Sequence, residues 1–430
     1  MRRVLLPLAQ SRPQRVPELR RRLWRPGHPG AGRPAAPGKW AGPVCAALTA
    51  NSLIKEKRTM FTSTTKVMGL VLILVVGVLA FGLTYAPALA QPQPPLIDQP
   101  VVAAAPAAQT SSFFDLCADD IGTVVMPNND SIPFWGFGEN TGTGCVVQLP
   151  GPVLRVTQGA AVTVTLTNYL DDASTSIVFP GQTGVTTIGG IAGLFTQEAA
   201  ANGGTVTYQF KATAPGTYLY ESGTDVQVQL PMGLYGALIV DPSTPGRAYS
   251  DASTAYNAEE VLVLSEIDPA LNNAADPYAF DLLEYRPTYW LLNGRAYGGP
   301  AGSNANPDVL DPDDASAQPY SSAISLTAGQ RLLVRYINAG GTHDTMSLLG
   351  LYQRVIARDA DELTAAPPAQ QYDTVAETIP SGHTTDVIIA PPAAGTFPLY
   401  NRQFHITNGS PGAGHFFPGG GMMTFITVGP

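Results

Sequence analysis

The chain has 430 residues, of which 44% are hydrophobic, 44 are glycine and 39 are proline. Charged residues make up 13%, about half the share of an ordinary soluble domain, which excludes a disordered polyelectrolyte and a highly charged helical bundle. The formal net charge is −9, and after residue 90 the chain holds 31 Asp and Glu against 10 Lys and Arg. Such a surface repels phosphate backbones, so nucleic acid is not an expected partner.

The first ninety residues are basic, with 14 Lys and Arg and only two acidic residues. Residues 67–83 form an almost wholly apolar run, and Ala88-Leu89-Ala90, an Ala-x-Ala pattern, precedes Gln91 as a signal-peptidase site requires. We therefore interpret residues 60–90 as an export signal that directs the protein to the periplasm or the extracellular space. Residues 1–59 are interpreted as a leader outside the folded protein, translated from a misassigned start, with a transit peptide as the alternative. Because the apolar run is just long enough to span a bilayer, an uncleaved anchor over 67–83 stays open.

After an expected disordered linker over 91–112, the chain shows strand-type patterns. Apolar residues and threonine alternate over 162–167, and Gly, Pro, Asn and Asp interrupt the pattern about every ten residues. No long stretch holds an apolar period of 3.6 residues. The patterns predict an all-β protein built from antiparallel sandwiches whose strands are joined mostly by turns.

An internal repeat indicates two copies of one sandwich. Three groups of residues recur in the same order with spacings that drift by loop-sized steps: Leu154, Val156, Gly159 and Asn168 as Ile324, Leu326, Gly329 and Asn338; Gly216, Thr217 and Tyr218 as Gly395, Thr396 and Phe397; Gly233, Leu238 and Val240 as Gly421, Ile426 and Val428. We predict a first domain over 113–242, a linker over 243–258 and a second domain over 259–430. Residues 260–267 are expected to form the first strand of the second domain.

Several segments resemble a known family. PGPVLRVTQGAAVTVTLTN, GTYLYESG and MGLYGALIVDP resemble the first cupredoxin domain of multicopper oxidases. LNGRAY, LTAGQRLLVRYINAG, GLYQRVIARDADEL and GGMMTFITV resemble a second such domain. The resemblance implies two tandem cupredoxin-like (plastocyanin-like) Greek-key sandwiches. It does not by itself imply oxidation, because activity depends on the residues of a site.

The ligands that the resemblance implies for copper are mostly missing. The family's three-copper cluster takes eight histidines in four His-x-His pairs, and residues 91–430 contain four histidines and no such pair. Where the family has its first two pairs, this chain has VFPG at 178–181 and YESG at 220–223. Neither Cys117 nor Cys145 lies in the late loop that carries the family's thiolate. A resident multicopper centre is therefore not expected within one chain.

A reduced copper site in the second copy stays an alternative. His343 follows the repeated Asn338 by five residues, and His405, His415 and Met422 lie in or beside the loop before the last strand. Three imidazoles with a thioether could bind a single copper ion. The competing interpretation is that these histidines belong to polar loops and that the methionine begins a core strand.

Cys117 and Cys145 are expected to form a disulfide, because both thiols lie in a chain that we expect in an oxidising compartment. A bridge over this span would stabilise the fold by about 3 kcal/mol, mainly through the unfolded chain. The pair lacks the Cys-x-x-Cys spacing of a redox or metal-binding motif.

Three functions follow from this sequence. The leading hypothesis is an exported protein similar to multicopper oxidases that acts as a binding or assembly module for an unidentified protein or small molecule, rather than as an enzyme. The second is a copper-dependent oxidoreductase with a reduced site, or with one built between subunits of a homo-oligomer. The third is an envelope structural protein held in the membrane by residues 67–83.

Overall fold

The computed structural model describes residues 111–126, 130–297, 322–403, 405 and 421–430. The expected leader over 1–59, the export signal over 60–90 with its apolar run, and His415 lie outside these residues. Within the described part of the chain, no helix combines the length and the hydrophobicity needed to cross a bilayer.

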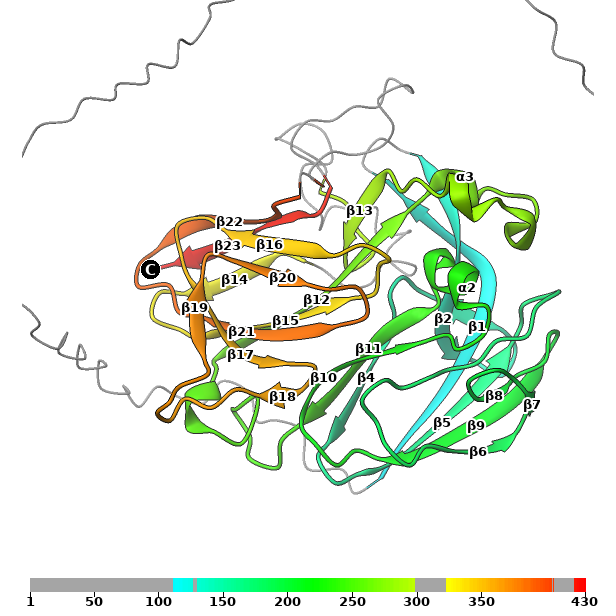
Figure 1. Cartoon of the computed structure of the whole chain (residues 1–430), viewed down its shortest axis with the longest axis horizontal. Helices are drawn as coiled ribbons and strands as arrows, with labels where there is room; N and C mark the ends of the chain where they lie inside the picture. Colours follow the sequence, from blue (N-terminus) through cyan, green and yellow to red (C-terminus); the bar gives the residue numbers. More distant parts are fainter. Residues whose placement is uncertain (1–110, 127–129, 298–321, 404, 406–420) are drawn as a thin grey trace, which may run out of the picture. The chain divides into compact units, whose positions relative to one another are not determined.

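The first domain is a β-sandwich of two sheets, drawn in cyan to green in Figure 1. One sheet has the order β3 (Cys145–Val147), β2 (Ser131–Asn140), β1 (Ser111–Val125), β5 (Ala161–Asn168), β9 (Gly204–Lys211), β6 (Thr186–Gly189). The other has the order β10 (Gly216–Glu221), β11 (Tyr235–Asp241), β4 (Gly151–Thr157). A separate hairpin consists of β7 (Ile191–Ala192) and β8 (Gln197–Glu198).

The second domain is also a sandwich of two sheets. The larger sheet has the order β13 (Tyr289–Leu292), β12 (Ala258–Ile267), β15 (Leu332–Asn338), β21 (Thr384–Ile389), β17 (Gln353–Arg358), β18 (Asp361–Glu362), with β19 (Tyr372–Thr374) paired to β17. The smaller has the order β14 (Ile324–Thr327), β23 (Met423–Gly429), β22 (Gly395–Asn401), β16 (Asp344–Leu348), β20 (Ala376–Ile379). The strand expected over 260–267 is thus present as β12.

Helices in the described residues are short and serve as connections. The two α-helices are α2 (Val226–Met232) and α3 (Pro269–Asn272), and the 3-10 turns are η1 (Ala252–Thr254), η2 (Pro277–Ala279) and η3 (Leu282–Glu284). Two expected linkers end earlier than the sequence indicated, because β1 begins at Ser111 and pairs with β5, and β12 begins at Ala258 and pairs with β15. The backbone hydrogen bonds of these pairings extend each strand into the preceding segment.

The internal repeat corresponds to the same strand pairings in both domains. In the first domain, β4 runs parallel to β11 with Leu154 opposite Leu238, and in the second, β14 runs parallel to β23 with Ile324 opposite Ile426. These residues are the repeated pairs of the sequence. The repeat therefore preserves the alternation that turns one face of each strand toward its core.

The repeated asparagines fasten equivalent loops. The Asn168 side-chain amide donates to the carbonyls of Ala173 and Ala199, and its oxygen accepts from the N–H of Leu170. Asn338 does the same, with donation to the carbonyls of Thr342 and Ile379 and acceptance from Gly340. Both asparagines are fully buried, so each supplies the hydrogen bonds that a loop entering the sandwich would otherwise lack.

Three large apolar clusters organise the interior. One fills the first sandwich and one the second, with Val164, Tyr208 and Leu238 in the former and Val334, Met346 and Ile426 in the latter. The third joins residues of both domains, including Phe134 and Tyr235 of the first and Ile267 and Tyr289 of the second. The two sandwiches therefore share a continuous apolar contact.

Candidate functional site

The two segments that take the place of the family's first histidine pairs lie side by side in the first domain. The N–H of Val178 donates to the carbonyl of Glu221 over 2.8 Å, and the N–H of Glu221 donates to the carbonyl of Val178 over 3.2 Å. Opposite residues of such an antiparallel pair present their side chains on the same face. The fold thus brings Val178 and Glu221 together where the resemblance places two imidazoles.

Position 223, the last of the second pair, has no room for a side chain. A Cβ atom on Gly223 would lie 2.6 Å from Cγ1 of Val178 and 3.1 Å from Oγ of Ser176. Since a β-branched side chain such as valine is stiff, Val178 would have to be displaced for an imidazole to enter. The crowding is incompatible with the histidine that the family carries there.

Next to Val178 and Glu221 in the chain, buried hydroxyl and amide groups of both segments form a hydrogen-bonded network. The Gln229 side-chain oxygen, from α2, accepts from Thr175 over 2.8 Å and from Ser222 over 2.6 Å. The hydroxyls of Ser176 and Thr224 lie 2.9 Å apart. These polar groups satisfy one another, so they serve packing rather than a metal ion.

The resemblance places histidines at positions 178, 180, 221 and 223. Glu221 is the one ionisable side chain at these four positions. Burial raises the pKa of its carboxyl group from 4.5 to about 7, because desolvation disfavours the charged form. Among the described residues, no hydrogen bond or ion pair of this carboxylate compensates the loss of water. Residues 29–342 contain no histidine at all. The residues of the first domain therefore do not fit a cluster of copper ions held by imidazoles.

The second domain holds a polar cluster around His405. The imidazole stacks on the indole of Trp290, with ring centroids 4.5 Å apart and an interplanar angle of 7°. Its Nδ1 atom lies 3.3 Å from the Asn401 amide and 3.4 Å from Oδ1 of Asp344. The other carboxylate oxygen of Asp344, Oδ2, is buried and has no hydrogen-bond partner among the described residues.

Met422 adjoins the same cluster. Its Sδ atom accepts from the Asn401 amide over 3.2 Å, and its N–H donates to the carbonyl of His405 over 2.8 Å. The structure thus brings His405 and Met422 together, as the hypothesis of a reduced copper site expects.

His343 is placed differently. Its Nδ1 atom accepts from the N–H of Ser381 over 3.2 Å, and the side chain lies at the surface. His415 lies outside the described residues. Within the described residues, no group of three or more His, Cys, Asp or Glu side chains is arranged to hold a metal ion. The described part of this cluster offers one imidazole and one thioether, which is short of a complete copper site.

Asp344 and Asn401 were missed by the sequence analysis, although a signal was present. The residues of β16 alternate between buried and half-buried positions from Asp344 through Met346 to Leu348. Since neighbouring strand residues point to opposite faces, the inward position at this strand start belongs to Asp344 and not to the adjacent His343. The apolar alternation that follows could have indicated this.

The expected disulfide is confirmed. Cys117 of β1 and Cys145 of β3 form a bond of 2.04 Å, and their Cα atoms are 5.6 Å apart. Both strands belong to the same sheet, where β2 lies between them. The bridge therefore fastens the edge strand β3 to the middle of the sheet.

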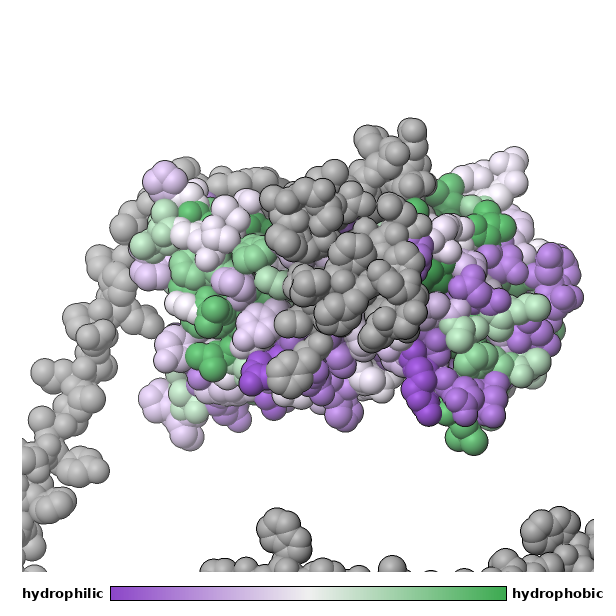
Figure 2. All heavy atoms as spheres, turned by 90° about the horizontal axis from the view of Figure 1, so that it is seen from above, coloured by the Kyte–Doolittle hydropathy of each residue, from purple (hydrophilic) through white to green (hydrophobic). Residues whose placement is uncertain are grey.

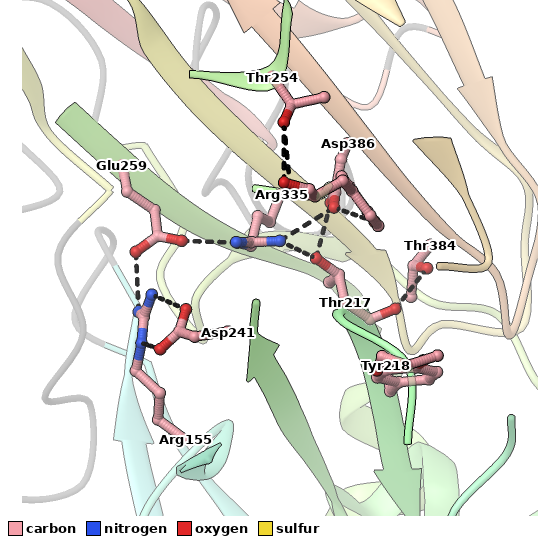
Figure 3. A network of polar contacts seen from close by, with 11 residues as sticks. Arg155, Thr217, Tyr218, Asp241, Thr254, Glu259, Arg335, Thr384 and Asp386 are labelled. Atoms are coloured by element: carbon pink, nitrogen blue, oxygen red, sulfur yellow. Dashed lines mark hydrogen bonds and ion pairs between the residues drawn. The ribbon is translucent and has the colours of Figure 1, made fainter. Parts of the chain in front are cut away.

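A second group of charged and hydroxyl side chains forms a buried ionic network between the two domains (Figure 3). Arg335 of β15 is fully buried, and its guanidinium donates to Glu259 over 2.6 Å, to Asp386 over 3.0 Å and to the hydroxyl of Thr217 over 2.9 Å. Burial alone would lower the pKa of Arg335, but the carboxylates of Asp386 and Glu259 raise it. Since Thr217 belongs to the first domain, the arginine connects both sandwiches.

The network continues through Glu259 to the first domain. Glu259 accepts from Arg155 over 2.7 Å, and Arg155 forms two further bonds of 2.7 Å to Asp241. The hydroxyl of Tyr249 donates to Asp386 over 2.6 Å. Every carboxylate of this network has a cationic or hydroxyl partner, which is the arrangement of a structural ionic network.

Comparison with known proteins agrees with this architecture. Residues 132–245 match the family model described as multicopper oxidase. The chain is related to the multicopper oxidases. It is 29% identical over 273 residues to copper resistance protein A of Pseudomonas syringae pv. tomato, which covers 57% of this chain and 42% of that protein. It is 28% identical over 268 residues to the multicopper oxidase MmcO of Mycobacterium tuberculosis, covering 58% of this chain and 48% of that protein.

Solved structures show the same fold. The blue copper oxidase from Nitrosomonas europaea aligns with a TM-score of 0.56 at 22% identity, over 74% of this chain and 85% of that one. The multicopper oxidase mgLAC aligns with a TM-score of 0.57 at 21% identity, over 74% and 86%. These structures confirm the all-β fold of two cupredoxin-like sandwiches. The chain spans less than half the length of the two curated relatives named above.

Proposed function

We propose that this protein is an exported binding or assembly module that uses the multicopper oxidase scaffold without a resident multicopper centre. One observation carries the proposal. The two segments that lie side by side in the first domain present Val178 and Glu221, and a side chain at Gly223 would collide with Val178. Carboxylate and apolar groups cannot replace the imidazoles that a cluster of copper ions requires.

The scaffold around these positions is intact, which supports a retained role rather than a damaged fold. Asn168 and Asn338 still fasten equivalent loops, and the polar groups below the Val178–Glu221 pair bond to one another. A surface for a partner needs this rigid support as much as a catalytic site does.

Export is part of the proposal. The Cys117–Cys145 disulfide is of the kind that persists in an oxidising compartment, and the apolar run over 67–83 is followed by Ala88 and Ala90 just before Gln91. The likeness to copper resistance protein A supports a role connected with copper. An unidentified protein or small molecule is the expected partner.

A second candidate function is a copper-dependent oxidoreductase with a reduced or interface-built site. It is favoured because the imidazole of His405 and the thioether of Met422, both copper ligands, each contact the side-chain amide of Asn401. A copper ion here would supply one-electron chemistry. The chain's own residues would fix the imidazole, with Trp290 stacked on its face and Asn401 and Asp344 at its Nδ1 edge.

Oxygen consumption by copper-loaded protein separates the two candidates. We expect the full protein, loaded with copper and freed of excess metal, to oxidise phenols no faster than a matched free-copper control. The physical reason is that the first domain offers no imidazole at the positions where the family binds oxygen-reducing copper. Oxygen consumption would be followed with an electrode, beside an electron paramagnetic resonance spectrum of the same sample.

Turnover above that control, with a copper signal lost in His405→Ala and Met422→Leu, would overturn the module proposal in favour of the oxidoreductase. His383→Ala is the matched control, because His383 is exposed and pairs with Asp359 away from the His405 cluster. Turnover lost equally in His383→Ala would point to adventitious copper.

A further inference from the structure

A hairpin of the first domain presents large apolar side chains to solvent. We name residues 188–198 the apolar hairpin; they include the end of β6, and β7 and β8 beside it (Figure 1). Leu194 is 84% exposed, Phe195 63%, Ile188 61% and Ile191 49%. Four such residues within eight positions form a concentration that a monomeric surface does not require. On the coloured part of the face shown in Figure 2, apolar and polar residues are interspersed.

Hydrogen bonds hold the backbone of the apolar hairpin in place, so its apolar side chains are exposed in a defined conformation. The N–H of Gly193 donates to the carbonyl of Thr196, which closes the turn. Glu198 accepts from the hydroxyl of Ser174 over 2.6 Å, and Ala199 exchanges two backbone hydrogen bonds with Thr175. A preorganised apolar surface loses little conformational entropy when a partner binds.

The hairpin adjoins the unpaired carboxylate of Glu221. The Cβ atom of Phe195 lies 3.7 Å from the position of a Cβ on Gly223, which in turn contacts Val178. Because Val178 and Glu221 are opposite residues of an antiparallel pair, the carboxylate belongs to the same face. The Glu221 carboxylate, which has no hydrogen-bond or ion-pair partner among the described residues, thus lies on the same face as Phe195 of the exposed hairpin.

The part of the chain that carries this surface is acidic. Residues 156–246 contain six acidic residues and a single basic residue, Lys211, with Arg155 and Arg247 just outside this stretch. A partner that covers the apolar hairpin must therefore bring apolar side chains together with cationic ones, since an acidic or neutral partner would leave Glu221 buried and unpaired.

We propose that the apolar hairpin and Glu221 form a docking surface for a basic, amphipathic segment of a partner protein. This inference rests on the proposed function, because it names the partner chemistry of the binding module. Leucine or phenylalanine side chains of the partner would cover Leu194 and Phe195, and a lysine or arginine would pair with Glu221. An anionic membrane is disfavoured as an occupant by the surplus of acidic residues.

Binding of designed peptides tests the proposal with the full protein. The probe is a fluorescent synthetic peptide of alternating leucine and lysine, and two control peptides replace either lysine by glutamate or leucine by serine. Fluorescence anisotropy at physiological salt should show binding of the first peptide alone. The double change Leu194→Ser with Phe195→Ser should weaken it at least about tenfold, and Glu221→Gln about threefold to tenfold.

Matched variants distinguish docking from general attraction to an acidic protein. Leu349→Ser removes a side chain that is 59% exposed in the second domain, and Glu139→Gln removes an exposed acid from β2; neither should change binding more than about twofold. Circular dichroism verifies that each variant is folded. Equal weakening in all variants, or no binding by the wild type, would overturn the proposal.

Two other occupants have their own readouts. Binding of the wild type to phosphatidylglycerol vesicles, lost in the hairpin variant, would replace the protein partner by a membrane. Sedimentation that shows an oligomer of the wild type and a monomer of the hairpin variant would assign the surface to a second copy of the chain. The oxidase assay measures copper chemistry and the peptide assay measures binding, so the failure of either proposal is visible separately.

Discussion

Glu221 is the residue on which the proposed function depends most. The resemblance places an imidazole at this position, and the fold keeps the backbone pairing with Val178 that would orient it. A carboxyl group in the same place is partly desolvated and has no cation beside it among the described residues. Its charged form is therefore destabilised, which makes it a measurable reporter of the site.

The stability of the protein should fall with rising pH because of Glu221. In the folded protein the pKa of Glu221 is raised to about 7 from 4.5, so between these values the native state holds a proton that the unfolded chain has lost. The free energy of unfolding is thus undiminished below pH 4.5 and decreases until about pH 7. At about 1.4 kcal/mol for each change of one in pKa, the loss is on the order of 3 kcal/mol.

Glu221→Gln should remove the part of this decrease that Glu221 contributes and make the protein more stable than the wild type at pH 8. The carboxyl group of Glu266, whose pKa burial also raises from 4.5 to about 7, contributes in both proteins. Urea unfolding at pH 4.5 and pH 8 would measure the difference, with Glu139→Gln, an exposed carboxyl of β2, as the control. The same pH dependence in the wild type and in Glu221→Gln would show that another group is responsible.

Sequence reasoning found some functional-type residues and missed others for local geometric reasons. The Cys117–Cys145 bridge followed from cysteine number and compartment. His343 and Asp344, by contrast, are neighbours in sequence, but only Asp344 turns toward His405 because side chains alternate along a strand. Trp290 could not be predicted to stack on His405, since that contact depends on how two distant strands are brought together.

At the scale of strands, the internal repeat could be recognised from the sequence because its residues occupy equivalent inward positions in both domains. Leu154 and Leu238 pair as Ile324 and Ile426 do, so the alternation constrains both copies alike. The hydrogen-bond network around Gln229 could not be predicted from the sequence. Its partners, Thr175 and Ser222, come from separate loops that meet only in the folded domain.

The strands β10, β15 and β21 are joined by Arg335, and its removal should destabilise the protein strongly. In Arg335→Met the carboxylate of Asp386 loses its buried cationic partner, and Glu259 loses one of two. Removing one member of a buried ion pair costs about 3 to 5 kcal/mol, because an uncompensated charge remains. Urea denaturation would show the change as a lower midpoint.

Arg354→Met provides the comparison within the same domain. Arg354 also forms a two-bond pair with a carboxylate, Asp373, but both side chains are more than 40% exposed. Exposed pairs contribute about 1 kcal/mol or less. Similar losses in the two variants would contradict a special role of the network between the domains.

At the scale of the whole molecule, the two sandwiches share an apolar interior. The described residues do not include the His-x-His pairs that the resemblance implies for an oxidase. The apolar cluster that includes Phe134, Tyr235, Ile267 and Tyr289 joins them, and the Arg335 network adds a polar connection. All four histidines of residues 91–430 lie in the second domain, from His343 onward. The fold alone therefore does not decide the chemistry of this protein, because activity depends on the residues of a site.

Counting copper in protein purified from its native compartment tests the central claim most directly. Metal analysis without added copper, on the full protein and on a conventional multicopper oxidase prepared in parallel, gives the number of tightly held ions per chain. We expect less than one copper per chain for this protein, because the first domain lacks imidazoles and Gly223 leaves no room for one. Several tightly held copper ions per chain would contradict the account.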